Sequence, residues 1–265
     1  MAGTFKELSL QAYKRISRAV FRKSWKAAKQ YRDAELERRN WIGEQLRSLP
    51  AGHSIIDIGA GECQYKEYCT HLNYVSQDVA HYDGQGDGSG LQTGTWDFSK
   101  IDIVCDIYDI PEDKTYDAVL CTEVLEHIVD APSAIVKFSR ILKSGGKLII
   151  TAPFACHKHF APHFYSSGYS EYFYRTMFAR LGIDVVEITS NGSYFRVMHN
   201  ELLRVASDAE NYSKTPLSLS DRDSLFKATA TMRRLIDAEE KYAGEKAAPS
   251  ADLACYGMHV VGMKR

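Results

Sequence analysis

The sequence predicts an α/β fold in which helices cover both faces of a mostly parallel sheet. Short apolar runs alternate along the chain with segments of helical periodicity, as in successive β–α–β units. The first run, residues 54–58, stops at a glycine-containing turn that leads into a predicted helix. Acidic residues end the next two runs at corresponding places. The sequence therefore predicts a crevice at the carboxyl ends of the strands, where ligands of such folds bind.

Local signals set the order and the limits of the elements. A helical region over residues 8–47, broken near Asp33, ends in a turn at residues 49–52. Further along, Ser170 caps a helix that stops at Gly182. The predicted strands are 54–58, 74–78, 101–107, 116–121, 147–151, 183–188 and 256–263. The other predicted helices are 65–72, 131–142, 170–181 and, interrupted near Pro216, 195–245. A mobile loop is predicted at 83–94, which is rich in Gly, Asp and Ser.

The composition is that of an ordinary globular protein. The 265 residues are 45% hydrophobic and 25% charged, which fits one large α/β domain. The formal net charge of −1 gives no general affinity for polyanions. The sequence lacks a secretory leader and a run long enough to cross a bilayer, and no two cysteines form a C-x-x-C pair. We therefore expect a cytoplasmic protein without a disulfide framework.

The first 33 residues are expected to form a separate basic arm, and residues 34–265 the main domain, with a helical insertion at about 195–250. The arm reads as an amphipathic helix whose apolar stripe includes Tyr13, Ile16 and Val20. The stripe either packs over the ligand cleft as a lid or contacts an anionic membrane surface, glycan or carrier. Nucleic-acid binding is not expected, because no recognition motif accompanies the charge. The basic residues of the arm are Lys6, Lys14, Arg15, Arg18, Arg22, Lys23, Lys26, Lys29 and Arg32.

Four short segments point to a nucleoside-containing ligand. Gly59 and Gly61 would let the backbone approach a ligand closely. Asp78, 21 residues after Asp57, is placed to accept hydrogen bonds from ribose hydroxyls. Asp106 ends the third strand. Each has a structural alternative, as a tight turn, a helix cap or a turn residue, but their joint placement at strand ends favours a ligand site. The fourth segment is residues 116–127, a strand that runs directly into a helix.

Together these segments resemble the class I methyltransferases, and within them the group that includes the quinone-biosynthesis enzymes. The resemblance spans about residues 38–190 and the last strand. It implies a Rossmann-like seven-stranded sheet whose last strand is antiparallel, and S-adenosylmethionine as cofactor. A nicotinamide enzyme is disfavoured, because Glu62-Cys63-Gln64 supplies no third glycine of the dinucleotide motif. The matching segments are Asp57-Ile58-Gly59-Ala60-Gly61, Asp78, Cys105-Asp106-Ile107, Cys121-Thr122-Glu123-Val124-Leu125-Glu126-His127 and residues 142–148.

The resemblance also implies how the cofactor lies. Gly59 and Gly61 would underlie its methionine portion. This turn departs from the family pattern at Cys63, where many relatives carry a third glycine. Asp78 would hold the ribose. Four further residues would contact the cofactor: Val79 beside the adenine, Asp106 and Ile107 flanking it, and Thr122 through its backbone. Arg38 is a weaker candidate, for the cofactor carboxylate.

Histidines are the candidate catalysts. A hydroxyl acceptor needs a general base, and imidazole suits neutral pH. His159 matches a His-x-x-Pro stretch of the family, His163 lies nearby, and His127 matches the end of its Leu-Glu-His segment, with a structural role as the alternative. His157, His159 and His163 also suggest a metal, but no carboxylate or cysteine is evidently placed to complete the ligand set, so no metal site is predicted.

The predicted function is methyl transfer to a small molecule or glycan, with oxygen favoured over carbon or nitrogen as the acceptor atom, in bacterial surface-sugar or natural-product biosynthesis. Two alternatives remain. One is methylation of a carbon atom on a quinone-like ring, which needs no histidine base. The other is a non-catalytic cofactor-binding module with a regulatory role, which the intact set of Asp57, Gly59, Gly61, Asp78 and Asp106 disfavours.

Overall fold

The computed structural model describes residues 34–213, 215–244 and 249–265. The predicted basic arm lies outside the described residues. Two compact units emerge: one combines Leu36–Ser193 with Leu253–Arg265, and the other includes, among the described residues, Tyr194–Asp252 with Ala34 and Glu35. Among the described residues, no helix has the length and apolar character needed to span a membrane.

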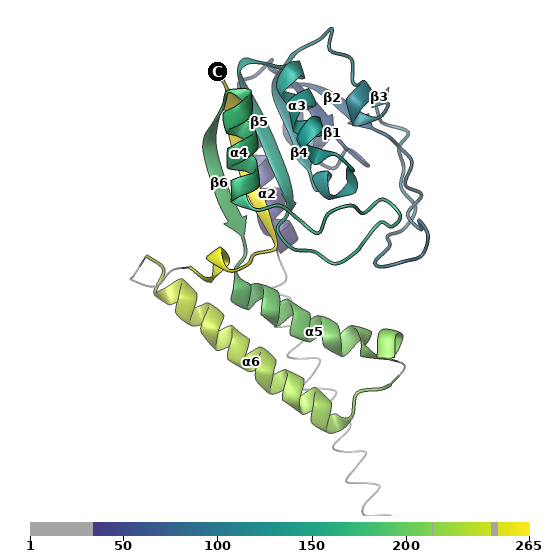
Figure 1. Ribbon diagram of the computed structural model, residues 1–265, viewed down its shortest axis with the longest axis vertical. Helices are drawn as coiled ribbons and strands as arrows, with labels where there is room; N and C mark the ends of the chain where they lie inside the picture. The colour runs from purple at the N-terminus through teal and green to yellow at the C-terminus, as the bar shows by residue number, and fades with distance from the viewer. Residues whose placement is uncertain (1–33, 214, 245–248) are drawn as a thin grey trace, which may run out of the picture. The chain divides into compact units, whose positions relative to one another are not determined.

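The larger unit is built on a seven-stranded sheet (Figure 1). Its strand order is β3-β2-β1-β4-β5-β7-β6, and β7 runs antiparallel to both of its neighbours while the other pairs are parallel. The predicted fold, with an antiparallel last strand, is therefore confirmed. The strands are β1 (Ser54–Ile58), β2 (Asn73–Asp78), β3 (Ile103–Val104), β4 (Tyr116–Thr122), β5 (Leu142–Pro153), β6 (Ile183–Asn191) and β7 (Gly257–Lys264).

Helices cover both faces of this sheet, with α3 (Ala131–Ile141) and α4 (Glu171–Leu181) on one face and α2 (Ala34–Arg47) on the other (Figure 1). Strand β4 is buried from both sides, because its alternate residues belong to the two different cores. Val119 packs with Phe138 and Phe178, whereas Leu120 packs with Ile42. Each such large side chain contributes about 1.5–3 kcal/mol of burial free energy.

Two predicted elements differ in the structure. The helix expected at 65–72 is only the 3₁₀ turn η2 (Lys66–Cys69), because the chain must return at once to the sheet through the Asn73 amide, which donates to the His53 carbonyl. The strand expected at 101–107 is the two-residue β3, which pairs only with β2 at the sheet edge. Two other 3₁₀ turns follow strands: η3 (Ile107–Asp109) and η4 (Leu125–His127).

The smaller unit contains a pair of helices, α5 (Tyr194–Ser213) and α6 (Leu219–Lys241), followed by the 3₁₀ turn η5 (Ser250–Asp252). Helix α6 begins with a capping box. Its Ser218 hydroxyl accepts from the Asp221 amide, and the Asp221 carboxylate accepts from the Ser218 amide. The segment was predicted to be helical with a break near Pro216, and the structure confirms this.

Candidate active site

The turn after β1 has the backbone that its glycines predict. Gly59 and Gly61 adopt φ values of 68° and 53°. A Cβ atom on Gly59 would collide with the Val124 side chain, and one on Gly61 would lie 2.5 Å from the Trp96 ring. Cys63 has a φ of 58°, a conformation that favours glycine. The turn thus exposes backbone at the end of β1 without bulky side chains.

Asp57 lies in β1, two residues before this turn. Its side chain is buried, and one carboxylate oxygen accepts a hydrogen bond from the Tyr74 hydroxyl at 2.7 Å. Burial raises the pKa of Asp57 to about 7, and the Asp78 carboxylate raises it further while the Tyr74 hydrogen bond lowers it. The charge of Asp57 is therefore sensitive to pH near neutrality.

Asp78 joins the ends of β1 and β2. Its Oδ2 accepts from the Gly61 amide at 2.9 Å, and its Oδ1 accepts from the Ala80 amide at 2.8 Å. An ionised carboxylate has about four lone-pair sites, so each oxygen keeps one for a ligand. The similar Asp106 caps η3 by accepting from the Tyr108 amide at 3.0 Å.

A cavity of about 280 Å³ opens above these strand ends. One part of its wall consists of the residues that follow β1, β2 and the edge strand β3. The other part consists of residues that follow β4 and β5. The lining residues are Gly59, Gln77, Asp78, Val79, His81, Tyr82, Trp96, Phe98, Asp106, Ile107, Tyr108, Glu123, Val124, His127, Ile128, Val129, Phe160, His163 and Tyr165.

Aromatic side chains from two loops form much of this wall. The Tyr82 ring stacks on Phe160 with 4.6 Å between centroids, and Phe160 in turn stacks on His127 at 5.1 Å. The glycine-rich loop 83–94 lies along the segment after β5: the Leu91 amide donates to the Lys158 carbonyl, and the Phe160 amide donates to the Leu91 carbonyl. The glycines of this loop allow such close backbone contact.

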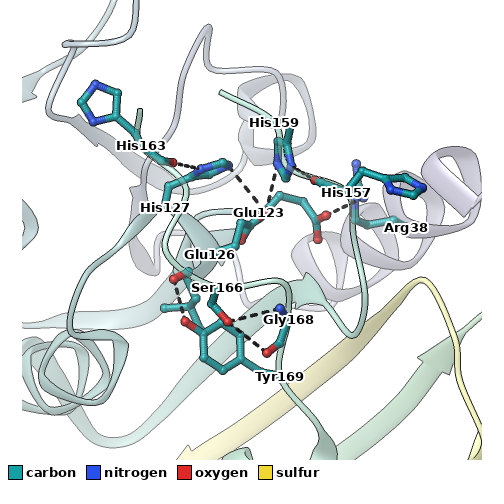
Figure 2. A network of polar contacts seen from close by, with 11 residues as sticks. Arg38, Glu123, Glu126, His127, His157, His159, His163, Ser166, Gly168 and Tyr169 are labelled. Carbon is teal, nitrogen blue, oxygen red and sulfur yellow. Dashed lines mark hydrogen bonds and ion pairs between the residues drawn. The ribbon is translucent and has the colours of Figure 1, made fainter. Parts of the chain in front are cut away.

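Three predicted histidines meet in one polar network (Figure 2). The Nδ1 of His127 lies 2.5 Å from the His163 carbonyl oxygen, and the Nδ1 of His159 lies 2.9 Å from the His157 carbonyl oxygen. Both Nε2 atoms face Glu126, at 3.7 Å for His127 and 3.8 Å for His159. Figure 2 shows the His163 ring turned away from this group, so His163 joins the network through its backbone only.

Burial controls the ionisation of this network. It lowers the pKa of His127 to about 4, although the bond to the His163 carbonyl raises it. It also raises the pKa of Glu126 well above its ordinary value, and the neighbouring Glu123 carboxylate acts in the same direction. A neutral His127 imidazole is therefore the expected form at neutral pH.

Glu123 forms a second polar contact at the strand ends. It follows β4 with a positive φ of 54°, and its Oε2 lies 2.9 Å from the Nη1 of Arg38 on α2 (Figure 2). Its amide donates to the Thr151 carbonyl at 2.8 Å, which fixes the backbone at this strained position. The pair places one cation and one anion beside the cavity.

Comparison with known families identifies the domain. Residues 56–150 match the family model described as a methyltransferase domain. The matched residues, which run from β1 into β5, are therefore a methyltransferase domain. Its cofactor is S-adenosylmethionine, and the protein is a methyltransferase, as the sequence predicts. No curated protein sequence gives a significant match.

Several solved structures resemble this chain at low sequence identity. Phosphoethanolamine N-methyltransferase 2 of Haemonchus contortus, in complex with phosphomonomethylethanolamine and S-adenosylhomocysteine, is 16% identical; the match covers 86% of this chain and 52% of that chain with a TM-score of 0.47. The YcgJ protein of Bacillus subtilis is 14% identical over 86% and 97% of the two chains, with a TM-score of 0.46. The O-MT segment of StiE is 16% identical over 86% and 74%, with a TM-score of 0.49.

The methyltransferase domain brings most of the predicted site residues together. Those that line the cavity are Gly59, Asp78, Val79, Asp106, Ile107, His127 and His163. Those that lie outside the lining are Arg38, Asp57, Gly61, Thr122 and His159. They support it: Gly61 holds Asp78, Arg38 pairs with Glu123, and Thr122 is the buried last residue of β4.

Sequence reasoning missed the roles of Glu123, Glu126 and the aromatic wall. Glu126 precedes His127 in the sequence, but no residue near it in the sequence indicates that its side chain is fully buried. The aromatic residues Tyr82 and Trp96 flank a glycine-rich loop, and large apolar residues in so polar a segment were the available signal.

Proposed function

We propose that this methyltransferase transfers the methyl group of S-adenosylmethionine to a hydroxyl oxygen of a small molecule or glycan. The observation that carries the proposal is the single cavity with two kinds of wall. Gly59, Asp78 and Asp106 line one part, and His127 and His163 line the other. The first part suits a nucleoside cofactor, and the second suits an acceptor that must lose a proton.

The proposed cofactor pose follows from the groups that remain available. The unused lone pairs of Asp78 would accept from the ribose hydroxyls. Val79 and Ile107 would pack against the adenine, and Asp106 would accept from its amino group. The ion pair of Arg38 with Glu123 offers opposite charges to the amino-acid end of the cofactor.

The proposed reaction asks little covalent chemistry of the protein, because the sulfonium methyl group is already activated. The hydroxyl oxygen attacks the methyl carbon, the carbon–sulfur bond breaks, and S-adenosylhomocysteine leaves with the electron pair on sulfur. A base must take the hydroxyl proton. His127, His159 and His163 are the candidates, and His163 is favoured because this residue lines the cavity and its ring lies apart from the Glu126 network.

The test is methyl transfer from labelled S-adenosylmethionine to a panel of bacterial surface sugars, hydroxylated natural products and quinone-like rings. We expect labelled methyl ethers from hydroxyl acceptors. Replacing the base with Ala should lower turnover about 10²–10⁴-fold while cofactor affinity stays unchanged. Full activity in His127→Ala, His159→Ala and His163→Ala would contradict a histidine base. Labelled methyl groups found only on ring carbon atoms of the quinone-like acceptors would favour carbon methylation.

A further inference from the structure

Glu126 is an unusual residue for the interior of this domain. Its side chain is fully buried, and neither carboxylate oxygen accepts a hydrogen bond from any described residue. Its backbone is firmly held, because the Glu126 carbonyl accepts from the amides of Tyr165 at 2.9 Å and Ser166 at 3.2 Å. A buried carboxylate without donors is costly unless a cation compensates it.

Two imidazoles converge on this carboxylate from different segments (Figure 2). His127 comes from η4, and His159 comes from the loop after β5. Their Nε2 atoms lie 3.7 Å and 3.8 Å from the Oε1 of Glu126. The three atoms all lie within 4.8 Å of one another. These distances are too long for hydrogen bonds but suit ligands that share one ion.

Backbone carbonyls set the tautomer of both rings. The His163 and His157 carbonyl oxygens can only accept, so the neutral imidazoles of His127 and His159 carry their proton on Nδ1. The lone pairs of both Nε2 atoms therefore point toward Glu126. This is the outer-sphere arrangement that orients histidine ligands in metal sites.

We propose that Glu126, His127 and His159 bind a divalent transition-metal ion such as Zn²⁺. Ligands at about 2.1 Å from a tetrahedral ion lie about 3.4 Å apart, so the two distances from Glu126 to the imidazoles need to contract by only a few tenths of an ångström. Two imidazoles and one carboxylate leave further coordination positions open. Magnesium and calcium are disfavoured, because they prefer oxygen ligands.

The proposed site includes a carboxylate, Glu126, which was missing from the ligand set considered from the sequence, and it replaces two of the histidines of that set with His127. His157 and His163, which the spacing had suggested with His159, contribute carbonyl oxygens instead of ring nitrogens. His127 also lines the cavity, so the proposed ion would be held by a residue of the cavity wall. An oxygen of the methyl acceptor is the ligand expected there, a statement that rests on the proposed function, whereas metal binding itself does not.

The experiment uses Co²⁺ alone as a spectroscopic probe for the untagged full-length protein after chelator treatment. We expect one equivalent of Co²⁺ to bind per chain with visible absorption bands of low-coordinate nitrogen and oxygen ligation. Zn²⁺ should abolish the bands, and Mg²⁺ should not. The melting temperature should rise with metal, because the folded state binds it. Absence of stoichiometric binding by the wild-type protein would overturn the proposal, whatever its methyl-transfer activity.

Substitutions assign the ligands. Glu126→Gln and His159→Gln should each weaken Co²⁺ binding by about 100-fold or more, beyond the effect of losing an outer-sphere partner. The control is His157→Gln, because the exposed His157 ring is two residues from His159 and its carbonyl stays in place. Equal loss in His157→Gln, or wild-type binding in both Glu126→Gln and His159→Gln, would refute the site. Because His159 is partly exposed, its variant remains informative if the buried Glu126 variant unfolds.

Discussion

At the scale of single residues, the turn after β1 depends on three residues in the left-handed backbone conformation, two of them packed against neighbouring side chains. Gly59, Gly61 and Cys63 all have φ values between 53° and 68°. These conformations turn the chain within a few residues and direct the Gly61 amide to Asp78. A side chain at Gly61 would meet the Trp96 ring, whereas Gly52, at a φ of 81°, has open space around it.

Substituting Gly52 and Gly61 distinguishes the cost of backbone strain from the cost of a steric collision. Gly52→Ala should lower the free energy of unfolding by about 1–2 kcal/mol, because it introduces strain alone. Gly61→Ala should cost more, since the new methyl group also displaces Trp96. Chemical denaturation of both variants measures the difference. An equal cost for both would show that Trp96 yields freely and does not support the turn.

Another residue couples folding to pH. His259 is buried against Trp41, with 4.6 Å between ring centroids, and burial lowers its pKa from 6.5 to about 4, assisted by the positive charge of Arg38. The unfolded state therefore binds more protons between these values, so stability is lost as pH falls from about 6.5 to 4. The loss should reach about 3 kcal/mol. His259→Phe should remove this part of the pH dependence in denaturation experiments, and an unchanged profile would contradict the assignment.

At the scale of elements, a lysine at the end of β7 donates hydrogen bonds to backbone carbonyls at the C-terminal end of α3. The Lys264 ammonium donates to the carbonyl oxygens of Ser139 at 2.7 Å and Leu142 at 2.8 Å. The last carbonyls of a helix have no partner within it and carry partial negative charge. Lys264 thus links the antiparallel strand to a helix that packs on the same sheet.

This link gives a prediction with a neighbouring control. Lys264→Met should lower the free energy of unfolding by about 1.5–3 kcal/mol, because two hydrogen bonds to a charged donor are lost. Arg265→Met should cost much less than Lys264→Met, since the ion pair of Arg265 with Asp184 is exposed to solvent. Thermal and chemical unfolding measure both. A larger loss of stability in Arg265→Met than in Lys264→Met would contradict the proposal that the Lys264 hydrogen bonds matter more than the Arg265–Asp184 ion pair.

Elements with a buried, periodic pattern were predictable from the sequence, and elements set by their surroundings were not. Strands such as β1 and β4 are apolar runs buried on both faces, so their sequence alone identifies them. The turn η2 was predicted as a longer helix because residues 65–72 have helical character, but the short connection to β2 leaves no room. Likewise, nothing within loop 83–94 indicated that it lies along the segment after β5.

At the scale of the whole methyltransferase domain, strand ends far apart in the sequence converge on one cavity. The sequence placed Asp78 and Asp106 at strand ends, and both line the cavity, because these acids follow strands at regular places. It did not predict the grouping of Glu126 with His159, since the two residues are 33 positions apart, with the whole of α3 and β5 between them. Parallel topology, which brings β4 and β5 together, creates that grouping.

The most direct test of this account is calorimetric titration of the full-length protein with S-adenosylhomocysteine. We expect a one-to-one complex with micromolar affinity. Asp78→Ala and Asp106→Ala should each cost about 1.5–3 kcal/mol of binding free energy, or about 10–150-fold in affinity, through loss of charge-assisted hydrogen bonds. Asp184→Ala, a surface carboxylate on β6, should bind as the wild type does. No binding by the wild type, or unchanged affinity in both Asp78→Ala and Asp106→Ala, would contradict the proposed cofactor site.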